Sequence, residues 1–361
     1  MKKELQFESI TSKFKGGKPF IISGPCSAET ESQMITTAKQ LAATGKVHAL
    51  RAGIWKPRTR PGQFEGAGAE GLQWLVMAKQ ETGLPITTEV ANAAHVEACL
   101  KAGVDILWIG ARTTVNPFSV QEIADSLRGV NIPVMVKNPV NPDIELWIGA
   151  FERLNQAGIK NLTAIHRGFS SFEKGPFRNA PMWDLAIELK TRVPGLEMIC
   201  DPSHISGNRE LIAMVSQKAL DLDMAGLMIE SHLNPDAAWS DAKQQVTPER
   251  LLEMLTDLVW RHETTTEQEF ITALTTLREQ INQVDDELLT LLGQRMKLSD
   301  KIGEYKKNNN ITILQTNRWN DILERAFKKG DTLGLTKEFI TKYFDAVHLE
   351  SIQHQNKVMN S

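Results

Sequence analysis

Residues 50–59 read LRAGIWKPRT, a short apolar run that leads directly into a positively charged loop. Pro57 rules out a helix through that loop, because proline lacks a backbone N–H and clashes with the preceding turn. Arg51, Lys56 and Arg58 therefore emerge together at the end of a strand. Clustered cations of this kind indicate an anion site, although the stretch alone fits a solvated basic loop equally well.

Short apolar runs like this one recur along the chain and alternate with amphipathic, helix-like segments. Continuous apolar runs are typical of parallel strands that are buried on both faces. Eight strand–helix units in about 245 residues predict a closed (β/α)8 barrel of the TIM type, with a doubly wound open sheet as the alternative. The expected strands are residues 19–23, 48–52, 86–89, 106–110, 134–137, 162–166, 197–201 and 227–230.

The pattern changes after the eighth unit, which predicts two domains: a barrel over residues 1–262 and an all-α domain over residues 270–361. Residues 263–269 form a charged, Thr-rich linker between them. From Phe270, apolar residues recur every three or four positions, which predicts one amphipathic helix of roughly 40 residues and about 60 Å. Such a helix must bury its apolar stripe against partner helices of its own or another chain. Two further helices are expected at about residues 316–329 and 336–359.

Composition excludes several functional classes. The 361 residues carry a net charge of −3, so the chain has no nucleic-acid footprint. We see no apolar run long enough for a membrane span and no signal peptide, and we expect a soluble cytoplasmic protein. The three cysteines suit a reducing compartment, with Cys99 and Cys200 in the core and Cys26 partly exposed after a strand end.

Functional residues of a barrel lie at the C-terminal ends of its strands. Six cations follow these ends, and like charges gathered at one mouth require anionic ligands, which arginine and lysine hold well. Their number suggests more than one anionic group. These cations are Arg51, Lys56, Arg58, Arg112, Lys137 and Arg167.

The same strand ends supply a possible metal site formed by Cys26, His204, Glu230 and Asp241. A lone histidine or cysteine is more often structural, but four potential ligands on one face of one barrel favour a divalent metal. The mixture of thiol, imidazole and carboxylates excludes a pure magnesium site and leaves manganese, iron, cobalt and zinc open.

Five motifs, in order along residues 19–260, resemble 3-deoxy-D-arabino-heptulosonate-7-phosphate (DAHP) synthase of the compact type. The related 3-deoxy-D-manno-octulosonate 8-phosphate synthase has Lys-Ala-Asn-Arg-Ser in the loop after the second strand, whereas this chain has Lys-Pro-Arg-Thr there. The motifs are Gly24-Pro25-Cys26-Ser27, Lys56-Pro57-Arg58-Thr59, Gly110-Ala111-Arg112, Asp201-Pro202-Ser203-His204 and the pair Glu230 and Asp241.

The resemblance implies that the barrel joins phosphoenolpyruvate to erythrose 4-phosphate, with Arg58 and Thr59 on the sugar phosphate. It also implies a divalent metal on the four ligands named above, with Mn²⁺ as the first choice. Lys56 would in addition donate a proton. The residues implied for phosphoenolpyruvate are Arg51, Lys56, Arg112, Lys137 and Arg167.

Three cations stand out on the long helix. At ~100° per residue, Arg295 and Lys306 share one face to within about 20°, while Arg278 lies about 100° off it and roughly 26 Å from Arg295. Arg278 is therefore either a surface charge or part of a pocket built with a second chain. Arg318 and Gln355, on the two later helices, are further candidates.

Residues 267–359 resemble the all-helical class of chorismate mutase, in which two chains interlace. The resemblance implies that Arg295, Arg318 and a partner's Arg278 hold the carboxylates of chorismate. Lys306 and Gln355 would bond its ether oxygen.

The helical domain departs from that family's pattern at two positions, because Gln315 and Trp319 replace an Asp and a Glu. We therefore weigh a bifunctional shikimate-pathway enzyme against a tail that mainly senses chorismate or prephenate and inhibits the barrel. A barrel that acts as the octulosonate synthase is a further alternative.

Overall fold

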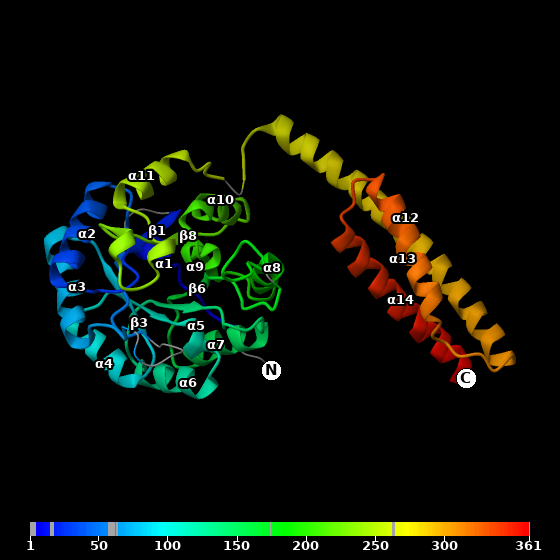
Figure 1. The fold of residues 1–361 in the computed structure, drawn as a ribbon, viewed down its shortest axis with the longest axis horizontal. Helices are drawn as coiled ribbons and strands as arrows, with labels where there is room; N and C mark the ends of the chain where they lie inside the picture. Colours follow the sequence, from blue (N-terminus) through cyan, green and yellow to red (C-terminus); the bar gives the residue numbers. More distant parts are fainter. Residues whose placement is uncertain are drawn as a thin grey trace. The chain divides into compact units, whose positions relative to one another are not determined.

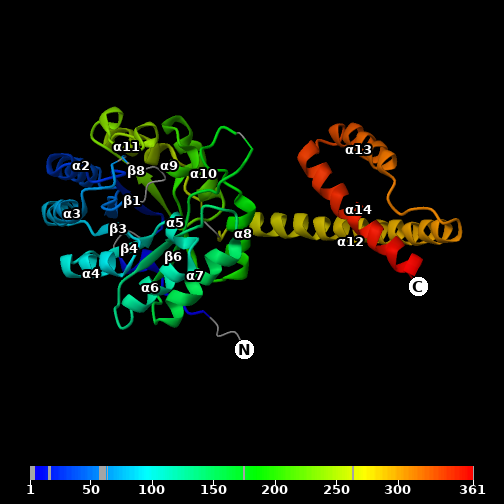
Figure 2. The same cartoon turned by 60° about the horizontal axis from the view of Figure 1, so that its bottom comes forward.

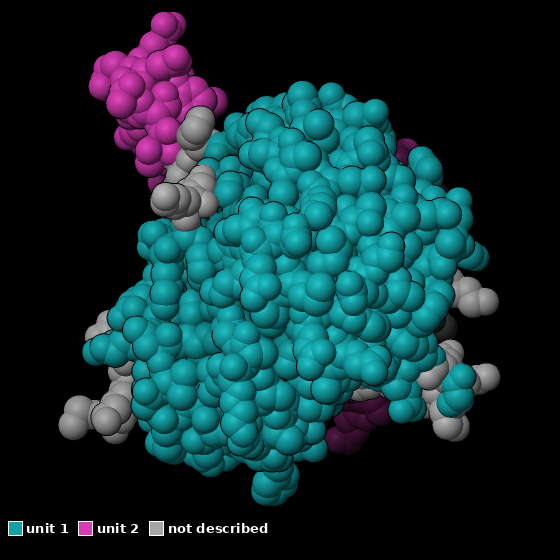
Figure 3. Space-filling view, turned by 90° about the vertical axis from the view of Figure 1, so that its left-hand side faces the viewer, with its two compact units in different colours: residues 1–263 teal, residues 264–361 magenta. Residues whose placement is uncertain are grey.

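The computed structural model describes residues 5–14, 18–56, 62, 64–173, 175–261 and 264–360. The chain separates into two compact units, Met1–Glu263 and Thr264–Ser361, which Figure 3 distinguishes by colour. No helix within the described part of the chain is long and apolar enough to cross a membrane.

The first unit is a closed barrel of parallel strands in the order β1 to β8, and β8 pairs back onto β1. This closure confirms the predicted barrel and excludes the doubly wound sheet. The strands are β1 (Phe20–Gly24), β2 (Ala49–Arg51), β3 (Ile86–Val90), β4 (Ile106–Ile109), β5 (Val134–Lys137), β6 (Leu162–His166), β7 (Glu197–Cys200) and β8 (Gly226–Glu230).

A ring of helices surrounds the strands, as Figure 1 shows. Two short helices that the apolar pattern does not predict, α5 (Ala111–Thr114) and α9 (Pro202–Ser206), follow β4 and β7 directly. The outer helices are α2 (Glu31–Ala43), α3 (Gly68–Thr82), α4 (Ala93–Ala102), α6 (Pro117–Ser126), α7 (Ile144–Gln156), α8 (Trp183–Arg192), α10 (Ile212–Asp221) and α11 (Pro248–Asp257).

The barrel interior is closed at the N-terminal ends of the strands. The short helix α1 (Ile10–Lys13) places Ile10 in an apolar cluster with Phe20, Trp108 and other inward-facing strand residues. Thr11 fastens this helix by donating a hydrogen bond from Oγ1 to Glu197 Oε1 at 2.7 Å. The opposite, C-terminal ends of the strands are thereby left for polar chemistry.

The second unit contains three helices: α12 (Gln268–Asn308, 41 residues), α13 (Thr316–Asp331) and α14 (Lys337–Asn360). Their bounds match the expected helices to within two residues at each end where both bounds were predicted, and Figure 2 labels all three. Gly303 lets α12 approach α14, because a side-chain carbon there would lie 3.1 Å from the Cα of Gln355. The N-terminal half of α12 exposes an apolar stripe, formed by Leu277, Ile281, Val284, Leu288 and Leu291.

Candidate active sites

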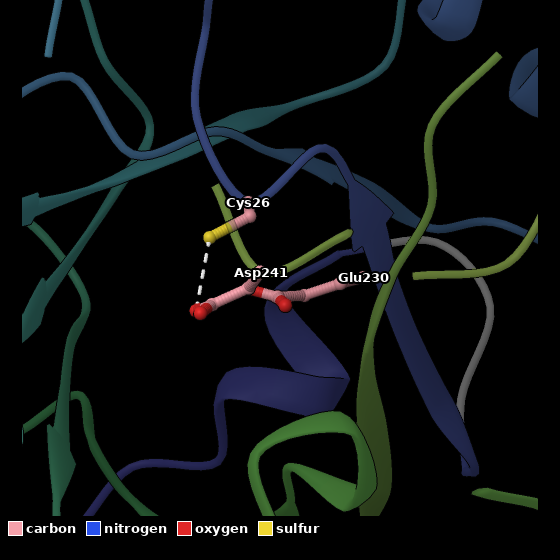
Figure 4. A group of neighbouring side chains, drawn as sticks. All are labelled: Cys26, Glu230 and Asp241. Atoms are coloured by element: carbon pink, nitrogen blue, oxygen red, sulfur yellow. Dashed lines mark hydrogen bonds between the residues drawn. The ribbon is translucent and has the colours of Figure 1, made fainter. Parts of the chain in front are cut away.

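Three side chains from separate segments meet at the C-terminal end of the barrel (Figure 4). Cys26 follows β1, Glu230 ends β8, and Asp241 lies in the loop after β8. The Cys26 Sγ and one oxygen of each carboxylate all lie within 4.8 Å of one another. The thiol also donates a hydrogen bond to Asp241 Oδ2 at 3.4 Å.

His204, on α9, turns its Nε2 toward the same place. This atom lies 3.8 Å from Glu230 Oε1 and 4.0 Å from Asp241 Oδ2, although His204 is not in the set within 4.8 Å. Its Nδ1 is hydrogen-bonded to Asp201 Oδ1 at 3.0 Å. A carboxylate on the far nitrogen of an imidazole is a common way to orient a metal-binding histidine.

The chemistry of this group fits a divalent metal. Oε1 of Glu230 is buried, accepts no hydrogen bond from the described residues and pairs with the Arg51 guanidinium at 3.2 Å, so it retains capacity for a further ligand. Burial and the nearby Glu230 raise the pKa of the Cys26 thiol to about 12. A bound cation would offset this charge crowding, and the S, N and O donors suit a transition metal.

Cys26 is fully buried, so the expectation of partial exposure is wrong. Lys56 covers it by donating from Nζ to the Cys26 carbonyl at 2.8 Å and to Sγ at 3.1 Å. Gln245 accepts a hydrogen bond from the Cys26 backbone N–H at 3.0 Å. These contacts come from loops whose positions no sequence periodicity reveals. Cys99 and Cys200 are buried, as expected.

Two of the predicted cations are buried near the candidate metal ligands. Arg51 ends β2, where its Nη2 lies 3.2 Å from Glu230 Oε1 and its guanidinium carbon 5.0 Å from the centre of the Trp108 ring. Its Nε and Nη1 have no hydrogen-bond partner in the described chain. Lys137 ends β5 and pairs with Asp201 at 2.8 Å. Unpaired guanidinium N–H groups in a buried position are suited to an anionic ligand.

Arginines also gather at the ends of β4 and β6. Arg167 is buried and donates from Nη1 to Asn179 Oδ1 at 2.8 Å. Burial, with the nearby charges of Arg178 and Arg112, lowers the pKa of Arg167 to about 10. Arg112 lies on α5 and is exposed. Arg58 and Thr59 lie outside the described residues.

Three polar residues of the site were given no role by the sequence interpretation. Arg178 lies in the loop after β6 and pairs through Nη1 with Asp241 Oδ1 at 2.9 Å. Gln244 donates from Nε2 to Glu230 Oε2 at 2.7 Å. Neither belongs to a recognisable motif, whereas Asp201 could have been found from its place in the Asp-Pro-Ser-His run.

In the second unit, Arg295 of α12 and Gln355 of α14 lie where the two helices face each other, and Lys306 of α12 reaches the segment between α12 and α13. Arg295 donates to Ser351 Oγ, and Lys306 donates to the carbonyl of Ile313. Burial lowers the pKa of both Arg295 and Lys306. Gln355 is buried, and its Oε1 has no hydrogen-bond partner among the described residues.

The other candidates of the helical unit lie at the surface. Arg278 on α12 and Arg318 on α13 are both exposed. Gln315 is exposed at the N-terminus of α13. The Trp319 ring stacks on His348 of α14, with 4.4 Å between ring centres. A single chain therefore gathers only part of the predicted chorismate-binding set.

A barrel whose strand ends combine a candidate metal-binding group with buried cations is typical of enzymes that act on anionic substrates. Sequence comparison identifies the family within this class of enzymes. The chain belongs to the DAHP synthetase I family, whose family model matches residues 6–268. The chorismate mutase type II family matches residues 277–356. The chain therefore combines a transferase domain and an isomerase domain of aromatic biosynthesis.

Similar proteins include a phospho-2-dehydro-3-deoxyheptonate aldolase of Thermotoga maritima, which is 32% identical over 66% of this chain and 68% of that protein. A 2-dehydro-3-deoxyphosphooctonate aldolase of Polaromonas naphthalenivorans is 30% identical over 66% of this chain and 89% of its own length. The crystal structure of the Thermotoga maritima enzyme aligns with a TM-score of 0.61 and 30% identity, covering 68% of this chain and 69% of that chain.

Proposed function

We propose that the barrel, over residues 1–262, condenses phosphoenolpyruvate with erythrose 4-phosphate to form DAHP and inorganic phosphate. The observation that carries this proposal is the convergence of Cys26, Glu230 and Asp241 beside the buried Arg51. This arrangement offers one place for a Lewis-acidic cation and a second for a strongly charged anion. The DAHP synthetase family match supports the choice of substrates.

In this reaction, C3 of phosphoenolpyruvate forms a bond to the aldehyde carbon of the sugar, water adds at C2, and phosphate leaves by C–O cleavage. A divalent metal on Cys26, His204, Glu230 and Asp241, with Mn²⁺ as our first choice and Fe²⁺, Co²⁺ or Zn²⁺ as alternatives, would supply Lewis acidity toward the aldehyde oxygen.

The cations of the barrel bring together two anions that repel each other in solution. We assign the free N–H groups of Arg51, with Lys137 and Arg167, to phosphoenolpyruvate, and Arg112 to the same substrate at the rim. Positive charge fixed before the substrates arrive stabilises the phosphate as it leaves. The Lys56 ammonium, 3.1 Å from Cys26 Sγ, lies beside the metal ligands and is our candidate proton donor.

Competition between erythrose 4-phosphate and arabinose 5-phosphate tests the choice of sugar. We expect DAHP as the main product. If 3-deoxy-D-manno-octulosonate 8-phosphate were the main product, the preferred sugar would be arabinose 5-phosphate. The barrel would then have the activity named for the Polaromonas relative.

Arg58→Ala tests the role of the loop after β2 in binding the sugar phosphate. It should raise the Michaelis constant for erythrose 4-phosphate about ten- to a hundredfold, because a charge-assisted contact contributes ~1.5–3 kcal/mol. An unchanged constant would show that Arg58 does not bind the sugar phosphate.

We propose that residues 270–361, reached through a linker at residues 263–269, rearrange chorismate to prephenate. Lys306 and Gln355 would bond the ether oxygen, and Arg295 and Arg318 the carboxylates. This unimolecular reaction needs only positioning and charge stabilisation.

A second chain would complete this site. Arg278 is exposed beside the apolar stripe of α12, so we infer a homodimer in which the partner subunit's Arg278 reaches the chorismate. Loss of chorismate absorbance measures turnover directly. Chorismate binding without turnover would instead favour a domain that senses chorismate. This is the main alternative because Trp319, which stacks on His348, stands where the chorismate mutase pattern has an acidic residue.

A further inference from the structure

The loop after β8 carries two adjacent glutamines, Gln244 and Gln245, that are almost completely buried. Neither is a candidate ligand or substrate-binding residue. Both side chains nevertheless make their hydrogen bonds within the metal-binding group and its supporting loops. Because the side-chain hydrogen bonds of both buried carboxamides are made around this site, we expect the two residues to have a role there.

Gln244 links the two carboxylates. Its Nε2 donates to Glu230 Oε2 at 2.7 Å and, at a longer 3.4 Å, to Asp241 Oδ2. Its Oε1 accepts a hydrogen bond from Arg178 Nη1 at 2.7 Å. Because Gln244 occupies Oε2, the other oxygen of Glu230 faces the charged groups of the site, 3.2 Å from Arg51 Nη2 and 3.8 Å from His204 Nε2, and accepts no hydrogen bond from the described residues.

Gln245 links the two loops that carry the remaining ligands. Its Oε1 accepts from the Cys26 backbone N–H at 3.0 Å, and its Nε2 donates to the Ser240 carbonyl at 2.8 Å. A hydrogen bond of 2.7 Å between the hydroxyls of Ser27 and Ser240 joins the same loops. The Gln245 side chain therefore helps to hold the loop of Cys26 against the loop of Asp241.

The backbone at Asp241 needs such support. Its φ is +49°, a left-handed conformation that residues other than glycine seldom adopt without support from their surroundings. Val246 fastens the far end of the loop by donating its N–H to the Glu230 carbonyl at 3.1 Å. Between these points, the two glutamines hold the loop against β1 and β8.

We propose that Gln244 and Gln245 are positioning residues of the metal site: Gln244 selects the oxygen of Glu230 that faces the metal, and Gln245 sets the distance between Cys26 and Asp241. The inference rests on the proposed metal site. A neutral amide suits this task, because it orients carboxylates without the positive charge that would compete with a bound cation.

Cobalt binding tests the proposal without any activity measurement. Metal-free, full-length protein would be titrated with Co²⁺ against a competing chelator while the absorption of the Co²⁺–thiolate bond is recorded. Gln244→Leu and Gln245→Leu keep the approximate size and remove the hydrogen bonds. We expect each to weaken Co²⁺ binding about tenfold to a hundredfold and to change the absorption band.

Gln217→Leu is the matched control. Gln217 also loses hydrogen bonds, to Asp221 and Val259, but it contacts none of the metal-binding group, so Co²⁺ affinity should stay at the wild-type value. Wild-type affinity and spectrum in both Gln244→Leu and Gln245→Leu would overturn the proposal.

Shorter variants keep the test decisive if a leucine variant fails to fold. Gln244→Asn and Gln245→Asn retain the amide but retract it by one methylene. Weaker Co²⁺ binding in them supports the proposal, and wild-type binding overturns it. Wild-type protein that binds no Co²⁺ would instead overturn the metal site itself, which separates the two failures.

Discussion

His166 and Arg167 are adjacent at the end of β6 but serve different parts of the molecule. Arg167 turns toward the cations of the barrel mouth, whereas the His166 ring lies among aromatic side chains, 5.1 Å from Trp183 and 5.9 Å from Phe169 between ring centres. His166 is fully buried. A histidine at the C-terminal end of a barrel strand can thus be a core residue. Its packing in the folded chain, and not its position in the sequence, distinguishes it from a residue of the site.

This burial predicts a pH-dependent stability. Burial lowers the pKa of His166 to about 3, whereas the unfolded chain titrates near 6.5. Below the unfolded value the unfolded state binds more protons, so the free energy of unfolding should fall as the pH falls. Between about pH 7.5 and pH 5, the loss from this residue should be about 2 kcal/mol.

Urea unfolding of the wild type and of His166→Phe, followed by tryptophan fluorescence across this range, measures the effect. The phenylalanine keeps the aromatic packing but cannot take up a proton, so its free energy of unfolding should depend less on pH. Parallel pH dependences in the two proteins would contradict the assignment.

At the scale of elements, the sequence interpretation was correct wherever burial produces a regular pattern of apolar residues. The strands were predictable because parallel strands buried on both faces form continuous apolar runs, and α12 because its stripe recurs every three or four residues. The short helices α5 and α9 were not, and neither were the contacts of Gln244 and Arg178. These depend on loop conformations, such as the left-handed backbone at Asp241, that leave no periodic signal.

The apolar stripe of α12 carries a prediction about assembly. Leu288 is 47% exposed in the single chain, yet it belongs to the apolar stripe that we assign to the dimer contact. Leu288→Glu would bury an unpaired charge in each half of that contact. We expect sedimentation equilibrium to show dissociation of the helical contact, and chorismate turnover to be lost with it.

Thr290→Glu provides the matched control, because residue 290 is exposed and projects about 160° away from Leu288 on the same helix. The same charge on that side should leave both the oligomeric state and the turnover unchanged. Full mutase activity in a dissociated Leu288→Glu protein would show that each chain builds a complete site alone.

At the scale of the whole molecule, the two compact units divide two kinds of chemistry between them. The barrel unit gathers a thiol, an imidazole and two carboxylates, a set of donors that suits a divalent metal. The candidate residues of the helical unit are cations and amides, groups whose chemistry suits a dicarboxylate without any metal. The two proposed activities should therefore respond differently to the loss of divalent cations.

The most direct measurement is to assay one preparation of the full chain for both reactions, with and without a strong chelator. We predict that DAHP formation falls to a small fraction of its initial rate and returns when Mn²⁺ is added in excess. Chorismate turnover should be unchanged throughout. DAHP formation that survives complete removal of the metal, or chorismate turnover that falls in parallel with it, would contradict this account.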